Sequence, residues 1–355
     1  MRMDTPVRLP EKHSGPVSGI PPVDIYGRGL RDLRISVTDR CNLRCRYCMP
    51  REIFGDSYRF LPSAELMSFD EIVLLTECLK GLGVEKIRIT GGEPLIRKNI
   101  EALIARISAI GIKDIALTTN ALLLSREKAR ALKSAGLDRV TVSLDALEKD
   151  TFQRMTGSSR EPGQVLEAID VAREAGFGPI KINMVVQRGI NEHMILPMAR
   201  HFRGSGHILR FIEYMDVGTS NGWSPRDVVP AAEIREMISR EWPLKPLPRH
   251  YPGEVARRYR YRDGAGELGF IASVTEPFCG GCTRLRLTAE GRLYTCLFGG
   301  RGHDLLGLLR GGAGRDEIAD VLATIWSGRS DRYSEVRKKF GQVDTDRREM
   351  WQIGG

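Results

Sequence analysis

The sequence lacks any apolar run long enough to cross a lipid bilayer, and its first ten residues lack the apolar core of a secretion signal. We therefore expect a protein that is neither inserted in a membrane nor exported, and that works in the cytoplasm. Long lysine runs, basic amphipathic helices and rows of interleaved aromatic residues are also missing. Their absence argues against a protein that only binds nucleic acid.

What is present is enough for a large folded unit. A chain of 355 residues with 41% hydrophobic residues can bury a sizeable core, as one large domain or about two ordinary ones. The formal net charge of +9 favours an anionic partner, but it does not choose between nucleic acid, a nucleotide and a membrane surface. Single basic residues recur inside predicted strands, which indicates a pocket for an anion.

From about residue 30, short β-branched runs alternate with helical patterns. The predicted strands lie near residues 33–38, 86–91, 114–120, 139–145, 180–186 and 208–215. The predicted helices lie near residues 64–80, 98–110, 125–135, 163–175, 192–203 and 230–240. Six β-α units in succession predict an α/β fold with a parallel sheet.

One face of this sheet is predicted to be polar. In residues 34–38, 86–90 and 140–145, aliphatic side chains alternate with basic or hydroxyl side chains. A sheet between two helical layers is apolar on both faces, and a closed eight-stranded barrel is filled with branched aliphatic residues. The pattern instead favours an incomplete (β/α)6 TIM-like barrel whose polar face surrounds a ligand.

The amino-acid composition of the sequence changes toward both ends. Residues 1–24 are rich in proline, glycine and charge and predict a flexible extension, to which we assign no role. Prolines break up the chain after Trp242, so we place a domain boundary near residue 245. The predicted parts are therefore the partial barrel, 25–245, and a smaller C-terminal domain, 246–355, which ends in two glycines.

Three cysteines with C-x3-C-x2-C spacing, Cys41, Cys45 and Cys48, follow the first predicted strand. Three thiolates this close together predict one metal centre, and a four-iron cluster held by three cysteines leaves one iron open to a ligand. A zinc knot with a distant fourth ligand, or a disulfide with one spare thiol, are the alternatives. Disulfides are disfavoured in a reducing compartment.

Other residues near this motif refine the prediction. Arg40, Arg44 and Arg46 lie beside the thiols, where we expect their positive charge to lower the thiol pKa values. The seventh cysteine, Cys78, stands alone in a helical pattern and is better explained as a small buried apolar side chain.

A second group, Cys279, Cys282 and Cys296, is by itself typical of a zinc ribbon with His303 as a fourth ligand. Between these cysteines, Arg284 and Arg286 alternate along one strand and so share a face. A structural zinc site does not need two guanidinium groups, whereas an anionic substrate docked at an open cluster does.

The sequence Gly91-Gly92-Glu93-Pro94 follows the second predicted strand. The glycines allow the backbone to approach a ligand closely, and the carboxylate can receive an ammonium group. The alternative is an ordinary strand-to-helix turn with proline at the first helical position.

Together with Tyr47 before the third cysteine, these motifs resemble the radical S-adenosylmethionine (SAM) superfamily. The resemblance implies a (β/α)6 partial barrel and a cluster that binds SAM on its open iron and reduces it to a 5'-deoxyadenosyl radical. It also implies that Glu93 binds the amino group of SAM, with further contacts from Tyr47, Gly91, Gly92, Ser143 and Met215.

The resemblance narrows with residues 32–42, 210–216 and 279–286 and with the terminal Gly354-Gly355. These stretches are similar to the radical SAM GTP 3',8-cyclases, lyases of molybdenum cofactor biosynthesis. That family implies two [4Fe-4S] clusters, the second of which binds the guanine of GTP. It also implies that the radical takes the hydrogen from C3' of the ribose and that the carbon radical attacks C8 of the base.

The same resemblance implies the residues around GTP, with Arg284 and Arg286 as catalytic residues. These positions are Arg34, Lys86, Arg88, Thr119, Lys181, Arg210, Arg284, Leu285 and Arg286. A buried triphosphate requires several converging cations, although Lys86 or Lys181 taken singly could equally form an internal salt bridge. The resemblance further implies that the tail, residues 347–355, enters the active site.

The reduction of SAM that the resemblance implies requires a low-potential electron donor. The next enzyme of the pathway, cyclic pyranopterin monophosphate synthase, and a second copy of this chain are candidate partners. A radical SAM enzyme with an auxiliary cluster that acts on a peptide or RNA is the alternative function. A second alternative, from a different functional class, is a zinc protein that binds nucleic acid without catalysis.

Overall fold

The computed structural model describes residues 21–300, 302–340 and 348–354. Most of the predicted N-terminal extension, and the last glycine, therefore lie outside the described residues. The described chain forms one sheet of twelve strands in the order β12-β11-β10-β1-β2-β3-β4-β5-β6-β9-β8-β7.

The centre of the sheet consists of six consecutive parallel strands. They are β1 (Asp32–Ser36), β2 (Lys86–Thr90), β3 (Asp114–Thr119), β4 (Arg139–Ser143), β5 (Lys181–Val186) and β6 (Ile208–Glu213). All six predicted strands are confirmed, with no end displaced by more than two residues. The predicted α/β fold with a parallel sheet is thus present.

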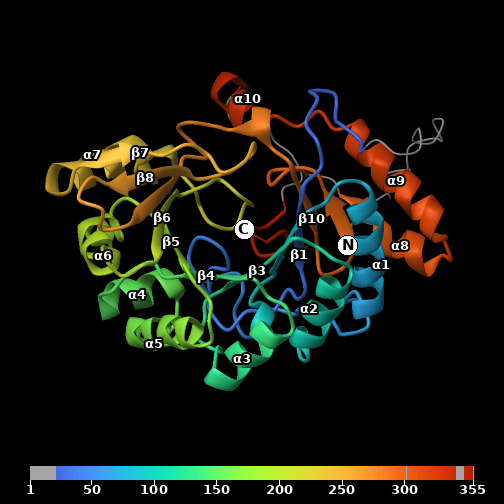
Figure 1. Cartoon of the computed structure of the whole chain (residues 1–355), viewed down its shortest axis with the longest axis horizontal. Helices are drawn as coiled ribbons and strands as arrows, with labels where there is room; N and C mark the ends of the chain where they lie inside the picture. The colour runs from blue at the N-terminus through green and yellow to red at the C-terminus, as the bar shows by residue number, and fades with distance from the viewer. Residues whose placement is uncertain (1–20, 301, 341–347, 355) are drawn as a thin grey trace.

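The helices that connect these strands cover the outside of the sheet. They are α1 (Phe69–Gly81), α2 (Ile100–Ala109), α3 (Arg126–Ser134), α4 (Lys149–Thr156), α5 (Pro162–Glu174), α6 (Ile195–Phe202) and α7 (Ala231–Glu241). Helix α4 was not predicted, and α1 begins at Phe69 rather than near residue 64 because Ser68 and Glu71 form a capping box there. Figure 1 shows these helices in an arc around the strands, with the C-terminal end in the middle.

The last third of the chain extends the sheet at both edges. Its elements are β7 (Leu244–Pro246), β8 (Arg257–Tyr261), β9 (Glu267–Ile271), β10 (Arg284–Leu287), β11 (Arg292–Tyr294), β12 (His303–Asp304), α8 (Leu305–Arg310), α9 (Arg315–Ser327) and α10 (Tyr333–Phe340). Strand β9 pairs in parallel with β6, and β10 pairs in parallel with β1. The sheet continues past the predicted domain boundary near residue 245, and that boundary stays a prediction.

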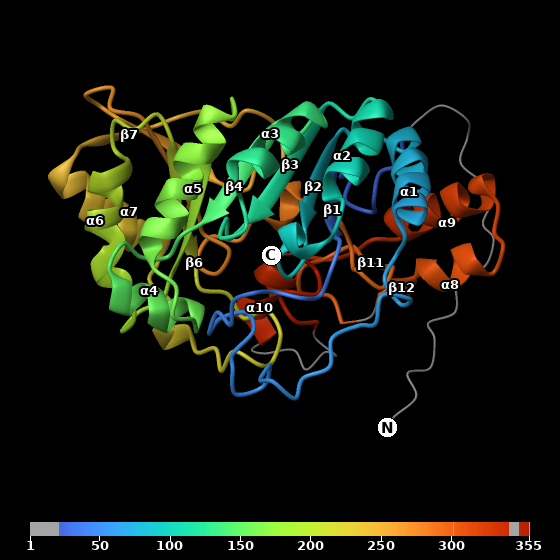
Figure 2. The same cartoon turned by 90° about the horizontal axis from the view of Figure 1, so that it is seen from below.

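The two faces of the parallel strands differ as the alternation predicts. Ile35, Ile87 and Ile182 are fully buried in the main hydrophobic core under the helices. On the other face, Arg34 lies opposite both Arg286 of β10 and Arg88 of β2. The register therefore aligns three arginines side by side across three adjacent strands (Figure 2 shows β1 and β2 next to each other).

Among the described helices, none combines the length and the apolar character needed to cross a membrane.

Two neighbouring residues of β5 test this division of the sheet. We expect Ile182→Ala to lower the free energy of unfolding by about 2 to 5 kcal/mol, because it leaves a cavity in the core. Lys181→Met should lower it little or raise it, because the Lys181 ammonium forms no hydrogen bond or ion pair with a described residue, and burial and then Arg210 lower its pKa to about 7. Urea unfolding without nucleotide measures both. Equal losses would contradict the proposed separation of core and cavity faces.

Candidate functional site

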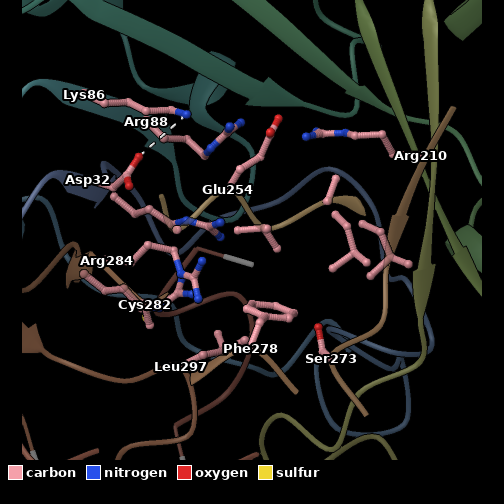
Figure 3. Close-up of a pocket in the computed structure, with 18 of the residues that line it drawn as sticks. Asp32, Lys86, Arg88, Arg210, Glu254, Ser273, Phe278, Cys282, Arg284 and Leu297 are labelled. Atoms are coloured by element: carbon pink, nitrogen blue, oxygen red, sulfur yellow. Dashed lines mark ion pairs between the residues drawn. The ribbon is translucent and has the colours of Figure 1, made fainter. Parts of the chain in front are cut away.

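The polar face of the sheet lines a cavity that is rich in positive charge (Figure 3). Its basic lining residues are Arg34, Lys86, Arg88, Lys181, Arg210, Arg258, Arg284, Arg286 and Arg329. Three acidic residues, Asp32, Glu254 and Asp331, line it as well. All seven basic residues predicted to surround GTP are therefore brought together in one place.

Some of these cations have internal partners. The Lys86 ammonium lies 3.6 Å from the Asp32 carboxylate and donates to the Tyr251 hydroxyl at 2.6 Å, so the salt bridge considered for Lys86 is present. Arg88 donates to the hydroxyls of Thr118 and Thr141, at 2.7 and 3.3 Å.

Other cations have no such partner among the described residues. The Lys181 ammonium forms no ion pair with a described residue, and Nε of Arg210 and Nη1 of Arg284 are buried without a hydrogen-bond acceptor. Buried polar groups normally find a partner in a folded protein. These nitrogen atoms therefore point to an anionic ligand in the cavity.

The pKa values express the same imbalance. Burial, together with neighbouring cations, lowers the pKa of Lys181 to about 7 and that of Arg210 to about 9. Burial followed by Arg284 lowers the pKa of Arg286 to about 10. A polyanion that enters the cavity would relieve both the desolvation and the mutual repulsion of these groups.

The second cysteine group opens into this cavity. Cys279 begins the short helix η4 (Cys279–Gly281), Cys282 follows it, and Cys296 lies just after β11; all three line the cavity. Burial raises the pKa of Cys296 to about 12. Burial acts in the same direction on Cys282, but Arg284 and Arg329 outweigh it and lower the pKa of that thiol to about 6.

The positions of the cysteines and of His303 argue against the zinc knot and the zinc ribbon considered above. His303 lies on β12 and is not among the residues that line the cavity. In the part of the chain that the structure describes, no three histidine, cysteine, aspartate or glutamate side chains form a site for a single metal ion. A four-iron cluster places its cysteines on separate irons, so it does not require them to converge on one point. All three thiols of each group are free, so each group has three ligands available to such a cluster.

The first cysteine group lies in the loop after β1, and all three of its thiols are free. The expected net lowering of their pKa values is wrong, although the Arg44 charge acts on Cys41 in the expected direction. Burial raises the pKa of Cys41 to about 12, and it raises the pKa values of Cys45 and Cys48 as well. The Arg44 guanidinium is bound instead by the backbone carbonyls of Cys41, Leu43 and Phe54, so it stabilises the loop.

The Gly-Gly-Glu-Pro segment packs tightly against the loop that leads to the first cysteines. A Cβ atom at Gly92 would lie 2.3 Å from the Arg40 carbonyl oxygen, which only glycine avoids. Glu93 precedes the short helix η1 (Pro94–Ile96), and its carboxylate accepts hydrogen bonds from the Leu95 and Asn120 amides. The turn with an N-terminal proline is thus also present. Burial raises the pKa of Glu93 to about 7.

The remaining predicted residues are distributed around these two centres. The Tyr47 hydroxyl donates to Asp145 at 2.9 Å, Ser143 ends β4, and Met215 lines the cavity. Two predicted GTP contacts do not place a side chain in the cavity. Thr119 donates to Glu93 at 2.7 Å, and the Leu285 side chain is buried in the core.

The C-terminal tail connects the two cysteine groups. The Gly354 carbonyl accepts hydrogen bonds from Nη1 of Arg286 at 2.8 Å and from Nη1 of Arg34 at 3.3 Å. Ile353 packs in a cluster that includes Cys296, and Trp351 packs in another that includes Cys41 and Cys48. The described part of the tail therefore reaches the cavity, while Gly355 lies outside the described residues.

Sequence reasoning missed several residues of the site. Tyr251 and Glu254 come from a proline-rich stretch without a recognisable motif, and Arg329 follows α9 far from either cysteine group in sequence. Asp145 lies two residues after the predicted SAM contact Ser143, and its position at the end of a strand was the only signal available.

Comparisons with known proteins agree with this arrangement. The Radical SAM superfamily matches residues 35–202, and Molybdenum Cofactor Synthesis C matches residues 207–335. The chain is similar in structure to Streptococcus suis SuiB bound to the precursor peptide SuiA, with a TM-score of 0.60 and 15% identity, over 88% of this chain and 67% of that one. At this identity the likeness shows the fold alone.

Curated relatives are much more similar in sequence. The GTP 3',8-cyclase of Acidothermus cellulolyticus is 56% identical over 88% of this chain and 88% of that protein. The enzyme of the same name from Xanthomonas campestris pv. campestris is 52% identical over 96% of this chain and 99% of its own length, and that of Staphylococcus haemolyticus is 45% identical over 94% and 98%. With its two cysteine groups and its cationic cavity, this chain belongs to the GTP 3',8-cyclase family of radical SAM enzymes.

Proposed function

We propose that this enzyme converts GTP into a 3',8-cyclised nucleotide by radical SAM chemistry. The observation that carries the proposal is the cavity itself, which combines buried cations without partners and one cysteine group in its wall. A triphosphate supplies the anion that these cations lack, and the family supplies the identity of the base.

Cys41, Cys45 and Cys48 would hold the first [4Fe-4S] cluster, with a low-potential electron donor as partner. When bound and reduced, this centre supplies a 5'-deoxyadenosyl radical from SAM. Glu93, Gly91 and Gly92 would hold the amino group of SAM, and Tyr47, Ser143 and Met215 would complete its binding site. The absence of a side chain at Gly92 lets this turn pack against the Arg40 backbone, which holds it beside the loop that leads to Cys41.

Cys279, Cys282 and Cys296 would hold a second [4Fe-4S] cluster beside the substrate. In Figure 3, Lys86, Arg88 and Arg210 lie at one end of the cavity, whereas Cys282, Arg284 and Phe278 lie at the other. We therefore orient GTP with its triphosphate at the first end and its guanine at the second. Arg34 and Arg286 would hold the tail carbonyl of Gly354 near the ribose between them.

The fold assignment follows from the same arrangement. Residues 25–245 would form an incomplete (β/α)6 barrel, and residues 246–355 would form the part that carries the second cluster. Thr119 would act through Glu93, and Leu285 through its backbone, because neither side chain lines the cavity. The next enzyme of the pathway and a second copy of the chain stay candidate partners.

Action on a peptide or RNA is the alternative function. The cations at the phosphate end are buried and close enough to lower one another's pKa values. This concentration of charge suits several phosphates at one point better than an extended backbone with one charge per residue.

A nucleotide panel tests the proposal directly. Protein reconstituted without oxygen should contain about eight irons and should cyclise GTP, but not ATP, CTP or UTP, with SAM and a strong reductant. We expect Cys41→Ala to abolish SAM cleavage, and Cys282→Ala to keep part of the cleavage while losing the cyclised product. Mass analysis of the products measures both steps. Cyclisation of no nucleotide, or equal loss of both steps in the two variants, would contradict the division between the clusters.

The affinity for GTP should fall as pH rises above about 7. The pKa of Lys181 is lowered from 10.5 to about 7 and that of Lys86 to about 8, first of all by burial. A bound triphosphate favours the protonated ammonium, so GTP binding takes up protons between pH 7 and the raised pKa values of the complex. Calorimetric titrations from pH 6.5 to 9 measure the slope.

Without ligand, the stability of the folded chain depends on pH in the opposite direction to the GTP affinity. Because the folded pKa of Lys181 lies below the unfolded value, the unfolded chain binds more protons between about pH 7 and 10.5, and stability rises with pH in that window. Lys181→Met should reduce the pH dependence of the GTP affinity and that of the stability. Lys149→Met, which removes an exposed partner of Glu161, should change neither of them. A GTP affinity independent of pH would remove Lys181 from the phosphate site.

Gly92→Ala tests the SAM site. A Cβ atom there would collide with the backbone oxygens of Arg40 and Asp39, so the loop before Cys41 must shift. We expect SAM affinity to fall by about tenfold or more, as for a lost charged hydrogen bond of about 1.5 kcal/mol or more, measured by equilibrium binding to the reconstituted protein. Gly163→Ala is the control, because its Cβ atom would meet no atom within 4 Å. Unchanged SAM binding in Gly92→Ala would separate this turn from the SAM site.

A further inference from the structure

We propose that Asp24, Arg28 and Arg329 form a buried brace that positions the cysteines of the second cluster. The proposal rests on the second cluster proposed above and assigns a role to three residues outside both cysteine motifs. We call these three residues the brace. None of them lies near Cys279 or Cys282 in sequence, yet all three meet at the turn that carries them.

Two guanidinium groups hold this turn through its backbone carbonyls. Nη1 of Arg28 donates to the carbonyl of Cys279 at 2.8 Å and to that of Asp331 at 2.9 Å. Nη1 of Arg329 donates to the carbonyl of Cys282 at 2.7 Å. Two of the three cysteines thus have their backbone carbonyls fixed by a charged donor.

Asp24 joins the two guanidiniums. Its carboxylate pairs with Nε of Arg28 and lies 3.4 Å from Nη1 of Arg329. Its other oxygen accepts the amides of Tyr26 and Arg28, both at 2.9 Å. One carboxylate therefore holds a short turn of the chain and neutralises two cations at once.

The brace is shielded from water. The side chains of Asp24, Arg28 and Arg329 are 0%, 3% and 1% exposed. The indole of Trp326 donates to the Arg28 carbonyl at 3.0 Å, and its ring lies 4.7 Å from the Arg329 guanidinium carbon. Figure 1 shows the segment before β1 passing close to α9, in agreement with the contact between Arg28 and Trp326.

The charges explain why Asp24 matters. Two buried guanidiniums beside the cysteine turn repel each other, and a carboxylate between them offsets that repulsion at short range. The other acid nearby, Asp331, is 30% exposed and lies 3.3 Å from Nε of Arg329. Without the charge of Asp24, the guanidiniums would separate and the carbonyls of Cys279 and Cys282 would lose their fixed positions.

Fixed carbonyls orient the cysteine side chains toward the cavity. Removal of a residue that orients a metal ligand typically lowers metal affinity by about 10-fold to 100-fold. The brace acts through the ligands rather than on the substrate, so its three members are positioning residues. Iron retention, not turnover, is the property that they should control.

Asp24→Asn tests the brace, because it removes the charge and keeps the shape. Wild-type protein and the variant are reconstituted without oxygen and exposed to an iron chelator, and iron release and the electron paramagnetic resonance spectrum are followed. We expect about half of the iron in the variant to leave about tenfold faster or more, with loss of one cluster signal. SAM cleavage, which depends on the first cluster, should be unchanged.

Two further variants complete the test. Arg329→Lys keeps the charge but loses the planar guanidinium, whose Nη1 reaches both Cys282 and Asp24 while its Nε faces Asp331. It should show the same selective loss of iron in milder form. Asp263→Asn removes an exposed partner of Arg203 far from the cavity and should behave as wild type.

The outcomes separate this inference from the proposed function. Wild-type protein with about four irons would refute the second cluster itself. Wild-type protein with about eight irons and an Asp24→Asn variant with equal chelator resistance would refute the brace alone. Loss of both clusters and of SAM cleavage in Asp24→Asn would show that Asp24 supports the whole fold, which would also overturn the assignment.

Discussion

The structure depends on an unfavourable arrangement, the crowding of buried positive charge on one face of a parallel sheet. The register aligns Arg286, Arg34 and Arg88 across three adjacent strands, and burial, followed by Arg286 and Arg88, lowers the pKa of Arg34. Such a face destabilises the folded chain when no anion is bound. The other face offsets that cost with a continuous aliphatic core under the helices. The alternation within each strand therefore serves stability on one side and ligand binding on the other.

The C-terminal tail links the parts of the site that are far apart in sequence. It reaches the arginines of β1 and β10 through the Gly354 carbonyl, and its apolar residues pack beside cysteines of both groups. Gly354 has a positive φ of 60°, and a Cβ atom there would lie 2.1 Å from the Thr90 methyl group. A residue with a side chain at this position would displace either the tail or β2. The terminal glycine that the sequence singles out is thus explained by space as well as by backbone conformation.

Much of the fold and of the site was predictable, because the deciding patterns are local. Strand alternation between Arg34 and Thr38 predicted the polar face, and the spacing of the cysteines predicted two groups of free thiols. The family resemblance predicted the seven basic residues that line the cavity. Properties set by long-range packing were not predictable. Burial, not the neighbouring arginines, decides the pKa of Cys41, and Thr119 turns toward Glu93 rather than into the cavity.

The pairing of β9 with β6 and of β10 with β1 has a consequence for biosynthesis. Until the last third of the chain has left the ribosome, the six central strands have two unpaired parallel edges, and such edges can associate with other chains. The native sheet is therefore completed only late in synthesis. Cys279, Cys282 and Cys296 come together at the same late moment, since β10 lies between Cys282 and Cys296 in sequence. A nascent chain that ends before residue 284 leaves the β1 edge unpaired beside the loop of Cys41, Cys45 and Cys48, so this edge needs protection until β10 is made.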